Sequence, residues 1–249
     1  MWIKICGNTN LEDAQLAVDA GADALGFVFA RSPRQVSEVQ VRGITDKLPP
    51  GIDTYGVFVD AALPEIVATV EGCRLNGVQL HVPDQVKQND LRLQLREYFT
   101  RHGQTLKIIP VLRWGVTKDS GAQEEIANYA SQPAFLEYGF DPSHDAVLVD
   151  SFSTKAVGGT GASFDWNQAK SCFLEAPPNL RMIVAGGLSP DNVQEAIRIL
   201  RPWGVDVVSG VESSPGKKDP ARVLAFVQAA REAAASLVAL PFSPANTNE

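Results

Sequence analysis

The stretch Ile3-Lys4-Ile5-Cys6-Gly7-Asn8-Thr9-Asn10-Leu11-Glu12 decides the fold, because a strand pattern changes into a helix start within it. Ile3 to Cys6 is short and β-branched, which is typical of a buried strand. Thr9 and Glu12 have the spacing of a capping box, in which two side chains satisfy backbone N–H groups at a helix N-terminus. Gly21 predicts the end of that helix, and residues 24–29 form the next apolar run. This opening therefore predicts a strand–helix–strand unit.

The same alternation continues along the chain. The runs that predict strands are Ile3–Cys6, Ala24–Phe29, Tyr55–Asp60, Gly77–His81, Lys107–Leu112, Ala146–Ser151, Arg181–Ala185 and Val205–Ser209. Eight strand–helix units of this size predict an α/β fold, a (β/α)8 TIM barrel. An open doubly wound sheet has the same local alternation, but its nucleotide-binding glycine pattern is absent after the first strand. The barrel is therefore the favoured fold.

The length fits one such barrel. The chain has 249 residues, and α/β barrels of ~250 residues form a single domain. We expect the barrel to span residues 1–240 and residues 241–249 to form a flexible C-terminal tail, because this end lacks periodicity. The connection over residues 113–145 is longer than the others, and we expect a helix over residues 124–130 within it.

Composition excludes several classes of protein. The formal net charge is −7 and no run of five or more Lys or Arg occurs, so a general nucleic-acid-binding role is not expected. Three widely spaced cysteines indicate a reducing compartment rather than a disulfide framework, and no signal peptide or membrane-spanning run is recognisable. The three histidines have no metal-binding spacing. The sequence therefore predicts a cytoplasmic protein with no metal site and no membrane partner.

In a barrel of this type, chemistry is done where the strands end at their carboxyl side. Cys6 ends the first strand, and Lys4 lies on the same strand face, so a buried ammonium below the thiol would favour the thiolate. Asp206 is a plausible partner for Lys4, because the eighth strand closes beside the first. Asp150 ends a strongly apolar run, where a carboxyl group is either a loop acceptor or an acid with a raised pKa.

Two further residues are candidate ligand contacts. His81 ends the fourth strand, where a lone histidine is more often structural or a ligand contact than a catalyst. Arg34 lies in the loop after the second strand and could hold a substrate carboxylate in a bidentate clamp. The alternative is that Arg34 is an exposed loop arginine with no ligand.

Glycine-rich turns follow the last three strands. They contain Gly159, Gly187 and the pair Ser209-Gly210. Glycine lets the backbone approach a ligand and point N–H groups at it, and phosphate sites of such barrels follow strands seven and eight. Together the three turns predict a phosphorylated small-molecule ligand.

These motifs occur together in a known enzyme family. The chain resembles phosphoribosylanthranilate isomerases in several ordered segments from residue 4 to about residue 227. The segments are Lys4-Ile5-Cys6-Gly7-Asn8-Thr9-Asn10, Gly21-Ala22-Asp23-Ala24-Leu25-Gly26-Phe27-Val28-Phe29, Ser32-Pro33-Arg34, Val78-Gln79-Leu80-His81, Gly158-Gly159-Thr160-Gly161, Ala185-Gly186-Gly187-Leu188, and Ser209-Gly210-Val211-Glu212 with Pro215-Gly216-Lys217-Lys218-Asp219.

The resemblance implies the third step of tryptophan biosynthesis, an Amadori rearrangement of N-(5-phosphoribosyl)anthranilate without metal or organic cofactor. It implies that Cys6 is the general base and Asp150 the general acid. It further implies that Arg34 lies near the anthranilate carboxylate, that His81 and Asp206 are site neighbours, and that the glycine turns bind phosphate. A monomer and a homodimer are both compatible with the sequence.

Two other functions remain open from the residues alone. One is a related phosphate-binding barrel enzyme, such as indole-glycerol-phosphate synthase, whose chemistry would require a catalytic lysine and glutamate at strand ends. The other is a catalytically inactive barrel that serves as a phosphosugar-binding sensor. The presence of both Cys6 and Asp150 favours the isomerase over either alternative.

Overall fold

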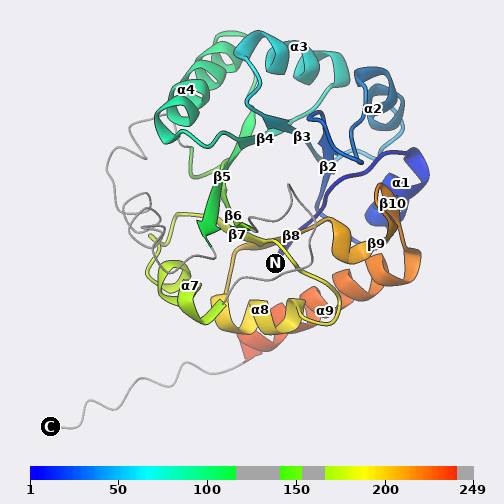
Figure 1. Cartoon of the computed structure of the whole chain (residues 1–249), viewed down its shortest axis with the longest axis vertical. Helices are drawn as coiled ribbons and strands as arrows, with labels where there is room; N and C mark the ends of the chain where they lie inside the picture. The colour runs from blue at the N-terminus through cyan, green and yellow to red at the C-terminus, as the bar shows by residue number, and fades with distance from the viewer. Residues whose placement is uncertain (116–140, 153–165, 240–249) are drawn as a thin grey trace, which may run out of the picture.

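The computed structural model describes residues 1–115, 141–152 and 166–239. These residues form a ring of parallel strands with helices outside it (Figure 1). The strands are β1 (Trp2–Ile5), β2 (Ala24–Val28), β3 (Asp53–Val59), β4 (Gly77–His81), β5 (Lys107–Gly115), β6 (Val147–Phe152), β7 (Met182–Ala185) and β8 (Gly204–Val207). The helices are α1 (Leu11–Asp19), α2 (Glu38–Thr45), α3 (Leu63–Cys73), α4 (Gln85–Arg101), α7 (Trp166–Leu174), α8 (Val193–Leu200) and α9 (Pro220–Ala239).

The pairing of β1 with β8 closes the ring. Trp2 pairs with Gly204 and Lys4 with Asp206 in parallel register, and each strand from β1 to β8 pairs with the next. This closure excludes the open doubly wound sheet and confirms the predicted (β/α)8 barrel. The expected tail over residues 241–249 and the expected helix over residues 124–130 lie outside the described residues.

Alternation along the strands divides the core into two parts. One cluster fills the barrel interior with the residues of one strand face: Ala24, Tyr55, Ile109, Val111, Ala146, Leu148, Ile183 and Ala185, with Trp2 packed against them. The intervening residues, such as Ile5, Val147 and Val149, pack outward against the helices. Because side chains alternate between faces, any residue in phase with the interior cluster points into the barrel.

The start of α1 differs from the sequence prediction. Asn10, rather than Thr9, is the N-cap: its Oδ1 accepts a hydrogen bond from the Asp13 N–H at 2.8 Å. Asparagine is among the strongest N-cap residues. The Thr9 hydroxyl instead donates to the Gly216 carbonyl at 2.6 Å, which ties the start of α1 to the far end of the chain.

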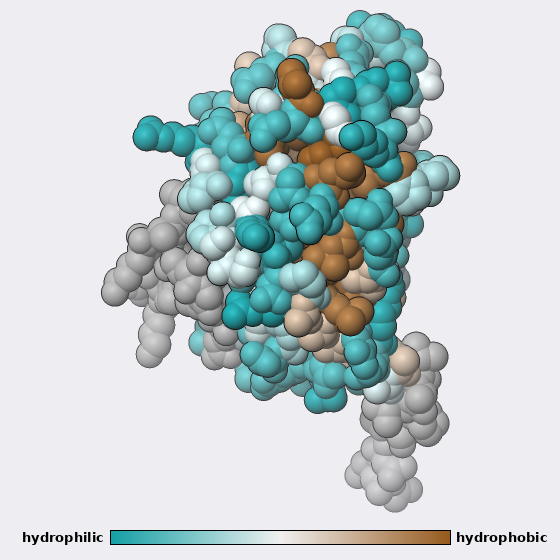
Figure 2. All heavy atoms as spheres, turned by 90° about the vertical axis from the view of Figure 1, so that its right-hand side faces the viewer, coloured by the Kyte–Doolittle hydropathy of each residue, from teal (hydrophilic) through white to brown (hydrophobic). Residues whose placement is uncertain are grey.

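A small hairpin after β8 was not predicted. A 3-10 helix (Ser209–Val211) leads into β9 (Glu212–Ser214), which pairs antiparallel with β10 (Lys217–Lys218). In Figure 1 this hairpin lies beside α1. Figure 2 shows the same side of the barrel, where an apolar band runs between hydrophilic side chains.

Two glycines are expected to respond oppositely to alanine. A Cβ at Gly77 would overlap the buried Tyr55 ring inside the barrel, whereas a Cβ at Gly43 in α2 meets nothing within 4 Å. We therefore expect Gly77→Ala to lower the free energy of unfolding by about 1–3 kcal/mol, because overpacking strains a core. Gly43→Ala should raise it by up to about 1 kcal/mol through helix propensity.

Urea denaturation of both variants beside the wild type gives these differences. Equal midpoints for wild type and Gly77→Ala would show that the Tyr55 ring can move out of the way without cost.

Candidate active site

The predicted catalytic residues lie at the carboxyl ends of their strands. Cys6 follows β1 directly, and its N–H donates to the Val207 carbonyl at 2.9 Å, so it continues the β1–β8 ladder. Asp150 lies in β6, in phase with Ala146 and Leu148 of the interior cluster. Both positions therefore face the mouth of the barrel, three strand positions apart around the ring.

A buried ammonium lies below Cys6. Lys4 is fully buried and donates to Asp206 Oδ1 at 2.8 Å and to Gln79 Oε1 at 2.7 Å. This confirms Asp206 as the partner that strand order suggested. Removing one member of such a pair leaves an uncompensated charge, at a typical cost of about 3–5 kcal/mol.

The charges around Lys4 shift the pKa values of Lys4 and Cys6. Burial works to lower the pKa of Lys4, but the charges of Asp206 and Cys6 raise it above its ordinary value. Burial raises the pKa of the Cys6 thiol, and the opposing effect of Lys4 is smaller. The Lys4 effect on the pKa of Cys6 thus has the direction expected from the sequence, but the effect of burial is larger. In the substrate-free chain burial thus favours the thiol form of Cys6, and the Lys4 ammonium favours the thiolate.

The Lys4 ammonium also determines how His81 is protonated. An ammonium only donates hydrogen bonds, so the Gln79 atom that faces it must be the carbonyl oxygen. The Gln79 amide nitrogen is then the group that lies 2.9 Å from His81 Nε2. Because that nitrogen donates, His81 Nε2 accepts, and the histidine carries its ring proton on Nδ1.

Two glycines make room for the site. A Cβ at Gly26 in β2 would overlap the Cys6 sulfur and come within 3.1 Å of Lys4 Cε. Gly7 has φ +73, and a Cβ there would come within 2.9 Å of Arg34 Cδ. Only glycine at both positions lets the thiol and the arginine occupy their observed places.

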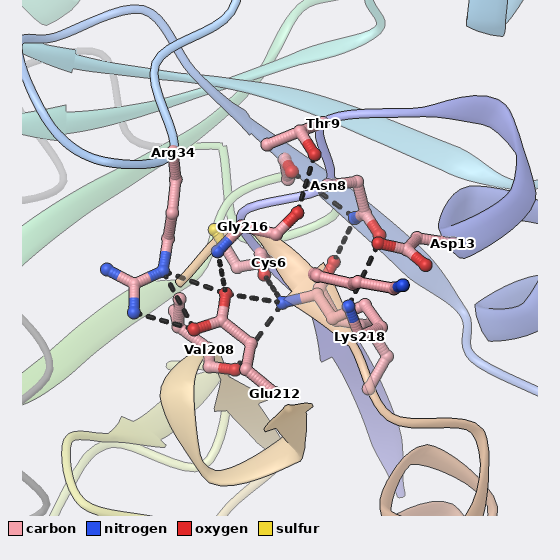
Figure 3. A network of polar contacts seen from close by, with 12 residues as sticks. Cys6, Asn8, Thr9, Asp13, Arg34, Val208, Glu212, Gly216 and Lys218 are labelled. Atoms are coloured by element: carbon pink, nitrogen blue, oxygen red, sulfur yellow. Dashed lines mark hydrogen bonds and ion pairs between the residues drawn. The ribbon is translucent and has the colours of Figure 1, made fainter. Parts of the chain in front are cut away.

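Arg34 is already held by a carboxylate of the chain. Its Nε and Nη2 donate to the two oxygens of Glu212 at 2.6–3.1 Å, as Figure 3 shows. Arg34 therefore makes a bidentate ion pair within the chain, and its predicted clamp on a substrate carboxylate stays a prediction. Glu212, Gln79 and Lys218 were not predicted as site residues, because their partners are remote in sequence.

The glycine turns lie where the sequence placed them, as far as the structure describes them. Gly187 follows β7 with φ +65. Ser209 and Gly210 form the 3-10 helix after β8, and a Cβ on Gly210 would collide with the Leu188 carbonyl. The turns after β7 and β8 therefore touch. Gly159 lies outside the described residues.

In the described part of the chain, no group of three or more His, Cys, Asp or Glu side chains is arranged to bind a metal ion. None of the helices in that part is both long and apolar enough to cross a membrane.

Comparisons with known proteins give one consistent result. The family model described as N-(5'phosphoribosyl)anthranilate (PRA) isomerase matches residues 3–106 and 117–229. N-(5'-phosphoribosyl)anthranilate isomerase of Pelobacter propionicus is 41% identical over 231 residues, which are 92% of this chain and 95% of the relative. The Geobacter sulfurreducens isomerase is 40% identical over 92% of this chain and 98% of its own length.

Solved structures agree with the sequence relatives. Phosphoribosyl anthranilate isomerase from Thermotoga maritima superposes with a TM-score of 0.76 at 33% identity, covering 93% of this chain and 99% of that chain. A phosphoribosyl anthranilate isomerase in complex with reduced 1-(o-carboxyphenylamino)-1-deoxyribulose 5-phosphate has a TM-score of 0.72 at 32% identity, with the same coverage.

The assignment of the His81 proton can be tested directly. The chain has three histidines, so nitrogen-15 NMR of labelled imidazoles is readily assigned with His102→Gln and His144→Gln variants. At neutral pH we expect a protonated Nδ1 and an unprotonated Nε2 for His81, because Gln79 donates to Nε2. Gln79→Met should remove this preference. A spectrum in which Nε2 of wild-type His81 carries the proton would contradict the hydrogen-bond assignment.

Proposed function

The chain belongs to the N-(5'-phosphoribosyl)anthranilate isomerase family, and we propose on this basis that it converts N-(5-phosphoribosyl)anthranilate into 1-(2-carboxyphenylamino)-1-deoxyribulose 5-phosphate. The reaction is an aldose–ketose isomerisation of the Amadori type, the third step of tryptophan biosynthesis. The observation that carries the proposal is the placement of Cys6 and Asp150 at the mouth of a closed barrel whose sequence matches the family model over most of its length.

Asp150 is the proposed general acid. Opening the ribose ring breaks the bond between C1 and the ring oxygen, and a proton delivered to that oxygen makes it a better leaving group. The anilino nitrogen supplies the electron pair, so C1 becomes part of an iminium. Asp150 must therefore carry a proton in the reactive complex.

Cys6 is the proposed general base. The iminium makes the hydrogen at C2 acidic, and the Cys6 thiolate removes it to give an enolamine. The enolamine then ketonises by gaining a proton at C1 and losing one from the C2 hydroxyl. The net change is one hydrogen lost at C2 and one gained at C1, so the reaction is an isomerisation that needs no external oxidant or reductant and no organic cofactor.

The remaining predicted residues are proposed to bind the two ends of the substrate or to lie beside it. Arg34 is proposed to bind the anthranilate carboxylate. His81 and Asp206 are proposed as neighbours of the site. His81 is hydrogen-bonded to Gln79, and Asp206 to Lys4, which in turn donates to Gln79. The phosphate is proposed to bind at backbone N–H groups of the late turns, with Gly159, Gly187, Ser209 and Gly210 as its contacts.

We also propose that the enzyme acts in the cytoplasm as a monomer or homodimer. Its three cysteines, Cys6, Cys73 and Cys172, form no disulfide, as is common in a reducing compartment. One solved relative, from Thermotoga maritima, is described as monomers generated from a dimeric isomerase, so both states are compatible with this fold.

The fluorescence decay of phosphoribosylanthranilate after addition of purified protein tests the proposal. We expect the wild type to accelerate the decay. Cys6→Ser and Asp150→Asn should each lower kcat by about 10²–10⁴-fold, because each removes one proton-transfer group, while the reduced product analogue still binds.

Matched controls are available for both variants. Cys172→Ser changes a cysteine in α7, and Asp90→Asn changes an exposed aspartate in α4; both should retain normal turnover. Folded wild-type protein with no acceleration would overturn the function, and near-normal turnover of either site variant would overturn the role given to that residue.

A further inference from the structure

The hairpin after β8 holds the candidate carboxylate-binding arginine in place. Glu212 in β9 is only 5% exposed, and both of its oxygens accept hydrogen bonds from Arg34. Although burial works to raise its pKa, the hydrogen bonds from Arg34 and the charge of Lys218 hold the pKa of Glu212 below its ordinary value. Glu212 therefore remains ionised beside the guanidinium at neutral pH.

Lys218 connects this ion pair to the end of β1. Lys218 in β10 is the register partner of Glu212 across the hairpin. Its ammonium is buried and donates to the Cys6 carbonyl at 2.5 Å and to Glu212 Oε1 at 3.3 Å. Its own backbone N–H donates to Asp13 at the start of α1, at 2.9 Å. Figure 3 shows Lys218 between Cys6 and Glu212, with Arg34 on the opposite side of that carboxylate.

The geometry of the guanidinium leaves one edge for a ligand. Within the described part of the chain, Glu212 takes Nε and one hydrogen of Nη2. Figure 3 shows the third nitrogen pointing away from Glu212. That nitrogen and the second hydrogen of Nη2 form an edge with the spacing that a carboxylate matches. Because Glu212 fixes one edge of the Arg34 guanidinium, it also sets the direction in which the other edge points.

We propose that Glu212 is a positioning residue, which aims the free edge of Arg34 at the substrate carboxylate, and that Lys218 joins this pair to the backbone of Cys6. The inference rests on the proposed function for the identity of that carboxylate. It extends the site to a hairpin more than 170 residues away from Arg34 in sequence. Glu212 acts here through Arg34 and does not touch the reacting atoms.

The test compares two probes that differ in the carboxylate alone. One is reduced 1-(o-carboxyphenylamino)-1-deoxyribulose 5-phosphate, and the other is the same molecule without the carboxyl group. In Glu212→Asp the shorter side chain keeps a charge near Lys218 but cannot reach both nitrogens of Arg34. We expect its affinity for the carboxylated probe to fall by about 10–100-fold, because a small displacement of a clamp has an effect of this order. The affinity for the second probe should not change.

Three companion measurements separate positioning from a general structural effect. Glu212→Gln should behave like Glu212→Asp, because an amide turns a donor toward the guanidinium. In an Arg34→Ala background, Glu212→Asp should cause no further loss for either probe. Lys217→Ala, an exposed change on the same hairpin, should bind both probes like the wild type.

With substrate, KM should rise in Glu212→Asp more than kcat falls.

Specific outcomes would overturn the inference. Equal losses for both probes, unchanged affinity for both, or a further loss in the Arg34→Ala background would each show that Glu212 does not act through Arg34. These binding results are independent of turnover. An inactive wild type with the expected probe pattern would therefore reject the isomerase activity alone, whereas an active wild type without that pattern would reject the role of Glu212 alone.

Discussion

The buried Lys4 ammonium is the interaction on which the candidate site depends. It lies inside the barrel, where a charge is costly unless it is compensated, and Asp206 and Gln79 compensate it from β8 and β4. The same ammonium lies below Cys6 and, through Gln79, fixes the proton of His81. One charge therefore links β1, β4 and β8 and influences both Cys6 and His81 above it.

A second set of charges in the site comes from different elements of the fold. Arg34, Glu212 and Lys218 come from a loop and a hairpin rather than from barrel strands. The net charge of −7 would repel an anionic substrate at long range, so attraction must come from local groups such as Arg34 and backbone N–H groups. In the proposed assignment, the strands hold the groups that transfer protons, and the loops hold the groups that recognise the ends of the substrate.

Much of this could be predicted from the sequence because it depends on local pattern. Short β-branched runs predicted every strand of the ring, and period-two alternation placed Lys4 and Cys6 on one face. Strand order alone suggested Asp206 as the partner of Lys4. The hairpin was missed because strands of two and three residues have no detectable periodicity, although the Pro215-Gly216 dipeptide indicates a turn there. The Arg34–Glu212 pair was missed because nothing local in a sequence reports a contact between remote loops.

The most direct test of the role of Lys4 is the titration of the Cys6 thiol. Ultraviolet absorbance of the thiolate against pH, with the curve of Cys6→Ser subtracted, isolates this thiol from the other two. Because the ammonium favours the thiolate and so lowers the pKa of Cys6, Lys4→Met should move the midpoint to higher pH. If Lys4→Met does not fold, Lys4→Met/Asp206→Leu should shift it in the same direction, since the Lys4 effect is the larger of the two. A midpoint that stays in place or moves to lower pH would contradict the account.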